Sequence, residues 1–309
     1  MNLIIIGNGF DLAHGMKTRY SRFRRFLHDN YELNWAKIKR CEEYPELPSV
    51  QTGHHGEKIV DDEVLVTLMG WLLAQCKGSG ERWEHFEDTL GNLDIETILD
   101  ENTEFCGDDN YFHEQQNYED VAMSICSAIE RFPELFEEWI DTVKIADAPR
   151  AAVAAMLNAD TLFLSFNYTE TLEVLYGIAR NKICYIHGRR NAGEQLLVGH
   201  GNDTREFKVE LGAEIPIYSI QQALRKNTSY AMQTHTSFFD GLATQNITDI
   251  YSYGFSFSDV DMVYITRICE SIDTSAIVWH LNSYEGKITR NRYKKKVLLC
   301  GFNGEFTTF

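Results

Sequence analysis

Four short segments of the chain combine glycines with side chains suited to phosphate binding or proton transfer, and each directly follows an apolar run. They are residues 7–15 (G-N-G-F-D-L-A-H-G), 165–170 (S-F-N-Y-T-E), 184–188 (C-Y-I-H-G) and 253–259 (Y-G-F-S-F-S-D). Each apolar run predicts a buried strand, and in an open parallel sheet ligands bind outside the carboxyl ends of the strands. We therefore expect all four segments at one ligand-binding edge.

The glycines of the first segment suit a phosphate group. Gly7 and Gly9 allow a tight turn and a close backbone approach, and the N-terminus of the following helix adds N–H donors and a favourable dipole. The spacing differs from the dinucleotide fingerprint G-x-G-x-x-G, because Gly15 comes six residues after Gly9. An ordinary strand-to-helix turn remains the alternative, since a single glycine motif is weak evidence.

The next three segments hold the candidates for catalysis. Asn167 follows a strand, where its amide could hold a ribose hydroxyl or a water, or could simply cap the next helix. His187 also follows a strand, and an imidazole that titrates near neutral pH suits a general base, with a packed structural histidine as the alternative. Gly254 permits close backbone approach to a ligand, while Ser258 or Asp259 suits a helix N-cap.

Alternating strands and helices are expected to position these segments. The rhythm predicts the α/β fold class, a Rossmann-like, mostly parallel sheet with helices on both faces, in a single domain over residues 1–309. Residues 41–150 break the rhythm and predict a mainly helical insertion, with the polar stretch 101–118 as a surface excursion. Strands are expected at residues 3–6, 161–166, 183–186, 195–198, 250–253, 276–281 and 296–299.

Composition narrows the class of protein further. The 309 residues are 44% hydrophobic, yet no stretch approaches the roughly 20 apolar residues that cross a membrane, and the N-terminus lacks the features of a secretory signal. The seven cysteines are widely spaced without a C-x-x-C pair, so neither a disulfide framework nor a structural zinc is expected. The net charge of −17 argues against nucleic-acid binding. A cytoplasmic protein that does not bind membranes is the expectation.

Together the four segments resemble the AbiH family of bacterial phage abortive-infection proteins. Their order and spacing also resemble the wider sirtuin-like NAD-binding superfamily, which shares the G-x-G-x5-G spacing of Gly7, Gly9 and Gly15. The likeness covers residues 1 to about 30 and about 160 to 300. It implies a sirtuin-like α/β domain that binds NAD, as substrate or ligand, with a role in antiviral defence.

The resemblance also implies roles for individual residues. Asn167 falls where the superfamily places an asparagine near the nicotinamide ribose, and His187 falls at its catalytic histidine, facing the ribose hydroxyls. The pyrophosphate is expected on the first loop and the adenosine ribose near the fourth segment. The expected cofactor-binding residues are Gly7, Asn8, Gly9, Phe10, Asp11, Gly15, Arg19, Gly254 and Ser256.

Two departures from the sirtuin pattern limit what can be transferred. Protein-deacylating sirtuins carry a zinc module with paired C-x-x-C motifs, which this chain lacks, so lysine deacylation is disfavoured. The stretch 16–20 (M-K-T-R-Y) lacks the sirtuin proline and phenylalanine, although Arg19 and Tyr20 could replace part of them. Arg19 also opens an arginine cluster that reads either as a solvated helix face or as a lid over an anionic ligand.

The leading hypothesis is an NAD glycohydrolase that cleaves the nicotinamide–ribose bond during phage defence. One alternative is a metal-dependent nuclease or nucleotide phosphohydrolase, in which a divalent ion is bound by Asp11, Glu84, Glu87 and Asp88. Another is a non-catalytic sensor that binds NAD or a related nucleotide. A homo-oligomer or a regulatory partner protein is a further expectation. The remaining histidines have no metal-ligand spacing: His54, His55, His85, His113 and His200.

Overall fold

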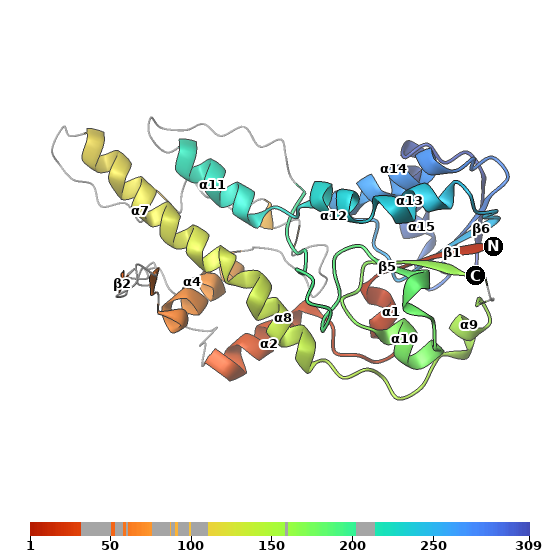
Figure 1. Cartoon of the computed structure of the whole chain (residues 1–309), viewed down its shortest axis with the longest axis horizontal. Coiled ribbons are helices and arrows are strands. Elements are labelled where there is room, and N and C mark those ends of the chain that lie inside the picture. The colour runs from red at the N-terminus through yellow and green to blue at the C-terminus, as the bar shows by residue number, and fades with distance from the viewer. Residues whose placement is uncertain are drawn as a thin grey trace. The chain divides into compact units, whose positions relative to one another are not determined.

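The computed structural model describes most of the chain and divides it into two compact units. It describes residues 1–31, 51–52, 58–59, 61–75, 87, 90–91, 99, 111–157, 160–201 and 214–309. Unit 1 comprises Met1–Arg19, Ile140–Leu197 and Asn227–Phe309, and unit 2 comprises Tyr20–Trp139 and Val198–Lys226 (Figure 1). Whether residues 41–150 are one insertion into a single domain stays a prediction.

Unit 1 is built on a six-stranded sheet in which every neighbouring pair is parallel, in the order β5-β4-β1-β6-β7-β8. This confirms the predicted α/β fold class. The strands are β1 (Asn2–Ile6), β4 (Leu162–Ser165), β5 (Ile183–Tyr185), β6 (Asp249–Tyr253), β7 (Val278–Leu281) and β8 (Glu305–Thr308).

Alternate residues of a strand point to opposite faces of the sheet. Both faces of this sheet carry buried apolar side chains, and helices cover both of them. Leu3 and Ile5 of β1 join one core, beneath α13 (Thr236–Leu242), α14 (Met262–Ser271) and α15 (Lys287–Leu299). Ile4 and Ile6 join the other, with Phe10 of α1 (Asn8–Ala13), Val153 of α9 (Ala151–Ala154) and Leu172 of α10 (Thr171–Tyr176).

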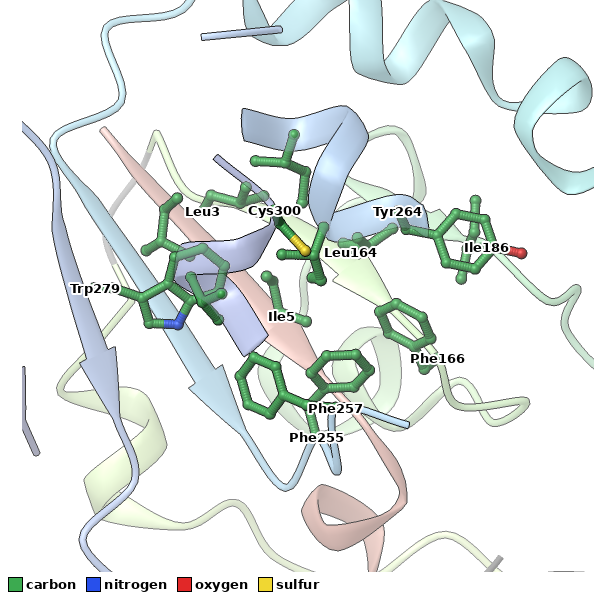
Figure 2. Packing of buried hydrophobic residues seen from close by; sticks show 14 of the residues in the cluster. Leu3, Ile5, Leu164, Phe166, Ile186, Phe255, Phe257, Tyr264, Trp279 and Cys300 are labelled. Atoms are coloured by element: carbon green, nitrogen blue, oxygen red, sulfur yellow. The ribbon is translucent and has the colours of Figure 1, made fainter. Parts of the chain in front are cut away.

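Figure 2 shows the first of these cores from close by. Phe255 and Phe257 lie in the loop after β6, and the centroids of their rings are 4.7 Å apart. The ring of Phe166, which follows β4, has its centroid 4.4 Å from that of Phe255. The loops at the carboxyl edge are thus anchored by aromatic side chains in the hydrophobic core. Burial of this kind contributes roughly 25 cal/mol per Å² of apolar surface, which favours one defined loop conformation.

Two predicted strands are wrong. Residues 195–198 form no strand. Leu196 and Leu197 are both buried outside the sheet, and two consecutive buried apolar residues give the same sequence pattern as a buried strand. Residues 296–299 are the last turn of α15, in which Tyr293 and Val297 are buried four residues apart while Leu299 is 87% exposed. The edge strand β8 was not predicted, and its alternation of exposed residues with only partly buried ones explains the weak signal.

Unit 2 is mainly helical in its described part, with one short β2–β3 pair (Gln51–Thr52 and Lys58–Ile59). The helices are α2 (Tyr20–Tyr31), α4 (Asp62–Gln75), α7 (Tyr111–Glu130), the first part of α8 (Phe132–Thr142) and α11 (Glu214–Leu224). The stretch 101–118, predicted as a surface excursion, lies outside the described residues up to 110, and from Tyr111 onward it forms the beginning of α7, in which Gln116 is exposed and Tyr118 is buried.

The negative charge of the chain belongs to unit 2. Its sequence holds 31 acidic and 14 basic residues, whereas unit 1 holds 15 of each, so unit 2 accounts for the whole net charge of −17. Unit 1 therefore has no net charge to oppose an anionic nucleotide. Among the described helices, none combines the length and the apolar character needed to cross a membrane.

Candidate functional site

The register of the sheet brings the four sequence segments to one edge. Ile6 pairs with both Ser165 and Tyr253, and Ser165 pairs with Tyr185, so β1, β4, β5 and β6 end level with one another. The segments that follow these strands therefore begin side by side, at the carboxyl edge where open α/β sheets bind ligands.

The first and fourth segments meet through their glycines. Gly9 donates its N–H to the carbonyl of Gly254 at 2.9 Å, and Gly7 donates to the carbonyl of Tyr253 at 3.2 Å. A Cβ atom on Gly7 would lie 2.7 Å from the Gly254 oxygen, and one on Gly9 would lie 2.6 Å from the Gly254 Cα. Phe10 donates its N–H to the Gly7 carbonyl at 2.8 Å. Backbone packing thus accounts for these glycines and uses three N–H groups of the loop.

Asp11 links the first segment to the second. Its two carboxylate oxygens accept hydrogen bonds from the hydroxyls of Thr169 and Thr171, at 2.6 and 3.0 Å. Burial raises the pKa of Asp11 to about 6, and the hydrogen bonds from these threonines oppose that rise. Both oxygens therefore serve the connection between the loops.

The other residues predicted to contact a ligand on the first loop have different surroundings. Asn8 donates from Nδ2 to the carbonyl of Thr18 at 3.0 Å, and the buried Phe10 ring contacts the rings of His14 and Tyr253. Gly15 adopts a φ of 79°, which favours glycine. Gly15 and Arg19 are exposed, and Ser256 on the fourth segment is half-buried.

His14 packs within unit 1. Its Nδ1 lies 2.8 Å from the carbonyl oxygen of Phe10, and its Nε2 lies 2.6 Å from the hydroxyl of Tyr176. Burial lowers the pKa of His14, so the neutral ring is favoured. These two contacts favour the structural role of His14 beneath the loop.

Asn167 is 4% exposed, and neither its Oδ1 nor its Nδ2 makes a hydrogen bond of normal geometry within the described residues. The amide lies near Asp11 and helps to hold down the pKa of that carboxyl group, which shows the closeness of the two side chains. Helix α10 begins at Thr171 with Glu170 as its N-cap, so Asn167 is not the cap that the sequence allowed. Leaving a buried amide without partners is costly, and such groups commonly mark ligand sites.

His187 occupies the equivalent position after β5 and is 2% exposed. Its ring lies among three aromatic rings, with centroid distances of 5.2 Å to Phe166, 6.4 Å to Tyr168 and 5.6 Å to Tyr264. Its Nε2 lies 3.4 Å from Oδ1 of Asp261, which is 6% exposed. The arrangement is a buried imidazole beside a buried carboxylate.

Sequence reasoning missed Asp261 and Tyr264. It considered Ser258 or Asp259 as the helix cap, whereas Asp259 is exposed and pairs with Lys296 at 2.7 Å, and the hydroxyl of Ser258 makes no cap bond. The turn η2 (Asp259–Asp261) places the second aspartate inward. An aspartate within a helix-initiating segment looks like a cap in sequence, so only the fold reveals its contact with His187.

A partly buried ion pair, in which Arg190 is buried and Glu170 is half-buried, joins the second segment to the residues that follow the third. Arg190 is bidentate to Glu170, with both nitrogen–oxygen distances at 2.8 Å, and its Nη1 donates to the carbonyls of Ile140 and Val143 at 2.7 and 2.6 Å. Paired guanidinium and carboxylate groups are tolerated in a protein interior when their hydrogen bonds are satisfied. This pair gives the loops carrying Asn167 and His187 a rigid support.

The predicted metal-ligand set is not assembled in the described part of the chain. Glu84 and Asp88 lie outside the described residues, and Glu87 of unit 2 pairs with Lys226 at 2.7 Å. No cluster of three or more histidine, cysteine or acidic residues suited to a metal ion occurs among the residues that were described. His54, His55, His85 and the side chain of His113 also lie outside them.

Comparison with known proteins gives one result. A family model described as "Bacteriophage abortive infection AbiH" matches residues 3–283. Neither the curated proteins nor the solved structures include a match to the chain.

Proposed function

This chain belongs to the AbiH family of bacteriophage abortive infection proteins, and from that premise we propose that it acts in phage defence by hydrolysing NAD at the nicotinamide–ribose bond. The proposal includes a sirtuin-like mode of NAD binding at the carboxyl edge of the sheet. Depletion of NAD would halt the metabolism of an infected cell, which gives the chemistry a defensive purpose.

The buried amide of Asn167 is the observation that carries the proposal. Neither the carbonyl oxygen nor the amide nitrogen of its side chain makes a hydrogen bond of normal geometry among the described residues. Asn167 lies two residues after Ser165, the last residue of β4, and His187 lies two residues after Tyr185, with which Ser165 pairs. A ribose offers hydroxyl groups that both donate and accept, and a water does the same. Such a ligand would give the amide hydrogen bonds of normal geometry, which it lacks among the described residues.

The proposed reaction consumes one NAD and one water, and His187 accepts the proton that the water loses. The bond between the ribose C1′ and the nicotinamide nitrogen breaks, and its electron pair leaves with neutral nicotinamide. A water oxygen then bonds to the oxocarbenium-like C1′, and the proton that the water loses passes to His187. The products are nicotinamide, ADP-ribose and a proton. A well-placed general base contributes about 10²–10⁴-fold to such a rate.

Release of nicotinamide from NAD, followed by chromatography, tests the proposal. We expect turnover by the unaltered protein and a loss of about 10²-fold or more in His187→Ala and Asn167→Ala. His280→Ala is the matched control, because His280 also pairs with an aspartate, Asp249 at 2.7 Å, but lies within β7. Thermal unfolding of each variant separates lost chemistry from lost folding.

The outcomes distinguish the alternatives. Absence of nicotinamide release with measurable NAD binding would favour a sensor over an enzyme. Turnover of nucleic acid or of nucleoside phosphates that a chelator abolishes would favour the metal-dependent hydrolase. Equal turnover in folded His187→Ala protein would remove the histidine from the mechanism.

A further inference from the structure

We infer that Asp261 is a positioning residue, whose buried carboxylate sets the pH range in which the His187 imidazole accepts a proton. Its catalytic consequence rests on the proposed function, but its effect on the ring does not. Nε2 of His187 lies 3.4 Å from Oδ1 of Asp261, which is within the range of an ion pair but is not a hydrogen bond of normal geometry, and both side chains are buried.

The imidazole ring of His187 contacts three aromatic side chains. Phe166 and Tyr264 meet the ring edge to face, while Tyr168 stacks on it, so the aromatic neighbours restrict the ring plane. The titratable groups among these neighbours are the phenols of Tyr168 on the β4 segment and Tyr264 on α14. Ordinary phenols ionise near pH 10, so among Tyr168, Tyr264 and Asp261 the group that is charged at neutral pH is the carboxylate of Asp261 on η2.

The position of Asp261 is fixed by the turn that carries it. Its backbone N–H donates to the carbonyl of Ser258 at 3.0 Å. Lys296 of α15 donates to the carbonyl of Phe257 and pairs with Asp259, both at 2.7 Å. Because Phe257 is also buried in the core, the turn is held from the core side and from the helix side. A carboxylate held in this way is already in place before a ligand arrives.

The pairing has a defined chemical consequence. At 3.4 Å, without a hydrogen bond of normal geometry, the Asp261 carboxylate acts on the His187 ring through its charge. A carboxylate at this distance also stabilises the imidazolium that forms, and so raises the affinity of the ring for a proton. In Ser-His-Asp enzymes a buried aspartate likewise stabilises the imidazolium form of its histidine.

Nuclear magnetic resonance of ¹⁵N-histidine-labelled full-length protein tests the inference without any substrate. The His187 signals are identified by their loss in His187→Gln. We expect the titration midpoint of His187 to be lower in Asp261→Asn than in the unaltered protein by about one pH unit, a roughly tenfold loss of proton affinity. Asp259→Asn removes the same charge from the same turn but on an exposed side chain, and its midpoint should stay near the original.

Two results would overturn the inference. One is a His187 titration in Asp261→Asn that matches the unaltered protein. The other is an equal shift in Asp259→Asn, which would make the effect one of general charge rather than of contact. Asp261→Glu keeps the charge, so the titration midpoint of His187 in this variant should stay close to that of the unaltered protein.

Nicotinamide release adds the catalytic readout. In Asp261→Asn we expect kcat to fall by about 10–10²-fold with little change in KM. We also expect the acid limb of the pH–rate profile to move to lower pH, because a less basic imidazole is deprotonated at a lower pH. If the unaltered protein releases no nicotinamide, the proposed function fails while the titration still decides the role of Asp261. A purely structural aspartate would lower stability without moving the acid limb.

Discussion

Gly9 and Gly254 touch backbone to backbone, joined by a hydrogen bond of 2.9 Å, although 245 positions separate them in the sequence. The contact ties the loop after β1 to the loop after β6, which are neighbouring strands of the sheet. It leaves no room for a side chain on either residue. Glycine is therefore required at both positions by the fold itself, whether or not a phosphate approaches the same loop.

Replacing Gly254 with alanine should destabilise unit 1 strongly. The new Cβ would lie 2.2 Å from the backbone nitrogen of Phe10, and the residue has a φ of 64° that alanine tolerates poorly. Gly177→Ala is the matched control, since Gly177 has a φ of 62° but an open surrounding. We expect a loss of about 1 kcal/mol for the control and at least about 3 kcal/mol for Gly254→Ala in denaturant unfolding. Equal losses would show that the backbone contact is absent in solution.

The sequence was sufficient to predict the strands that carry the candidate site, because β1, β4, β5 and β6 are short segments rich in apolar or aromatic residues, and a glycine or a polar side chain follows each of them within two residues. Periodicity failed where two patterns compete. The run at the end of α15 is apolar in sequence, yet Leu298 and Leu299 face solvent and only Val297 is buried among the three. At Leu196 and Leu197 the failure has a different cause, because both residues are buried without belonging to a strand.

The site itself was only partly predictable, for a physical reason. Asn167 and His187 each lie two residues after the end of a strand, so their placement depends on local pattern and sheet register. Asp261 reaches His187 through the packing of η2 and α14 against the sheet, which depends on long-range contacts. The meeting of Gly9 with Gly254 is likewise non-local, so the sequence suggested a phosphate loop where the structure also shows a packing requirement.

Asp11 should make stability depend on pH in the acid range. Burial raises its pKa from 3.8 to about 6, so the folded protein holds a proton there that the unfolded chain has already lost. The contribution of Asp11 to stability is therefore fully present below pH 3.8 and is lost as the pH rises through about 6. Asp11→Asn removes this dependence. Relative to the unaltered protein, the variant should gain about 2–3 kcal/mol between about pH 4 and about pH 7.

Unfolding free energies measured across that range check this prediction. Asp273→Asn serves as the control with opposite sign, because hydrogen bonding to Ser275 lowers the pKa of Asp273. The protein carrying Asp273 should therefore gain stability relative to its variant as the pH rises above the ordinary range of aspartate. A difference between Asp11→Asn and the unaltered protein that is constant with pH would contradict the raised pKa.

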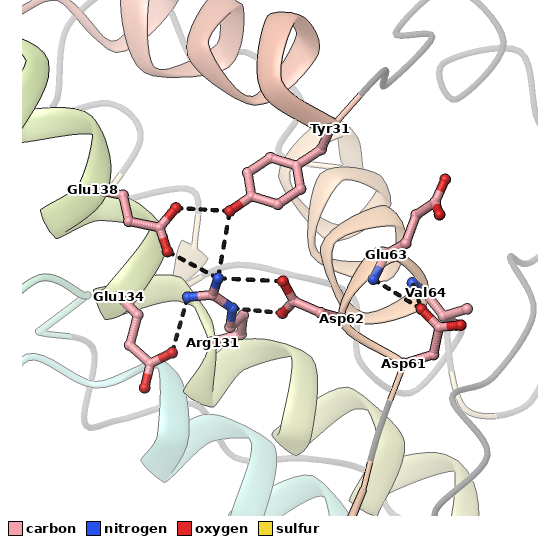
Figure 3. Close-up of polar contacts among 8 residues, drawn as sticks. All are labelled: Tyr31, Asp61, Asp62, Glu63, Val64, Arg131, Glu134 and Glu138. Atoms are coloured by element: carbon pink, nitrogen blue, oxygen red, sulfur yellow. Dashed lines mark hydrogen bonds and ion pairs between the residues drawn. The ribbon is translucent and has the colours of Figure 1, made fainter.

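Arg131 should be a stabilising centre of unit 2. Figure 3 shows its guanidinium among the carboxylates of Asp62, Glu134 and Glu138 and the hydroxyl of Tyr31. The shortest nitrogen–oxygen distances to the three carboxylates are 2.7, 2.9 and 2.9 Å. The hydrogen bond with Asp62 is the largest cause of the raised pKa of Arg131, and these contacts join α2, α4 and α8.

Arg131→Met should therefore cost about 1–2 kcal/mol, a modest figure because the carboxylates are partly exposed and screened by water. Arg131→Lys keeps the charge but loses the planar fork, so an intermediate loss is expected. Raising the salt concentration from about 0.05 to about 1 M should shrink the difference in stability between the unaltered protein and the methionine variant. Thermal unfolding measures all three proteins, and a salt-independent difference would indicate lost packing rather than lost ion pairs.

Asn167→Leu should leave the stability of the free protein unchanged or raise it by up to about 1 kcal/mol, because the substitution removes a buried amide that has no hydrogen bonds in the described structure. Thr169→Val provides the contrast: its hydroxyl donates to Asp11 at 2.6 Å, and its loss should cost about 1–3 kcal/mol. Denaturant unfolding of both variants gives the comparison, and nicotinamide release should disappear in Asn167→Leu. A stable but inactive variant would show that the amide is kept for a ligand. A loss of stability as large as that of Thr169→Val would show instead that the amide is satisfied within the protein and serves the fold.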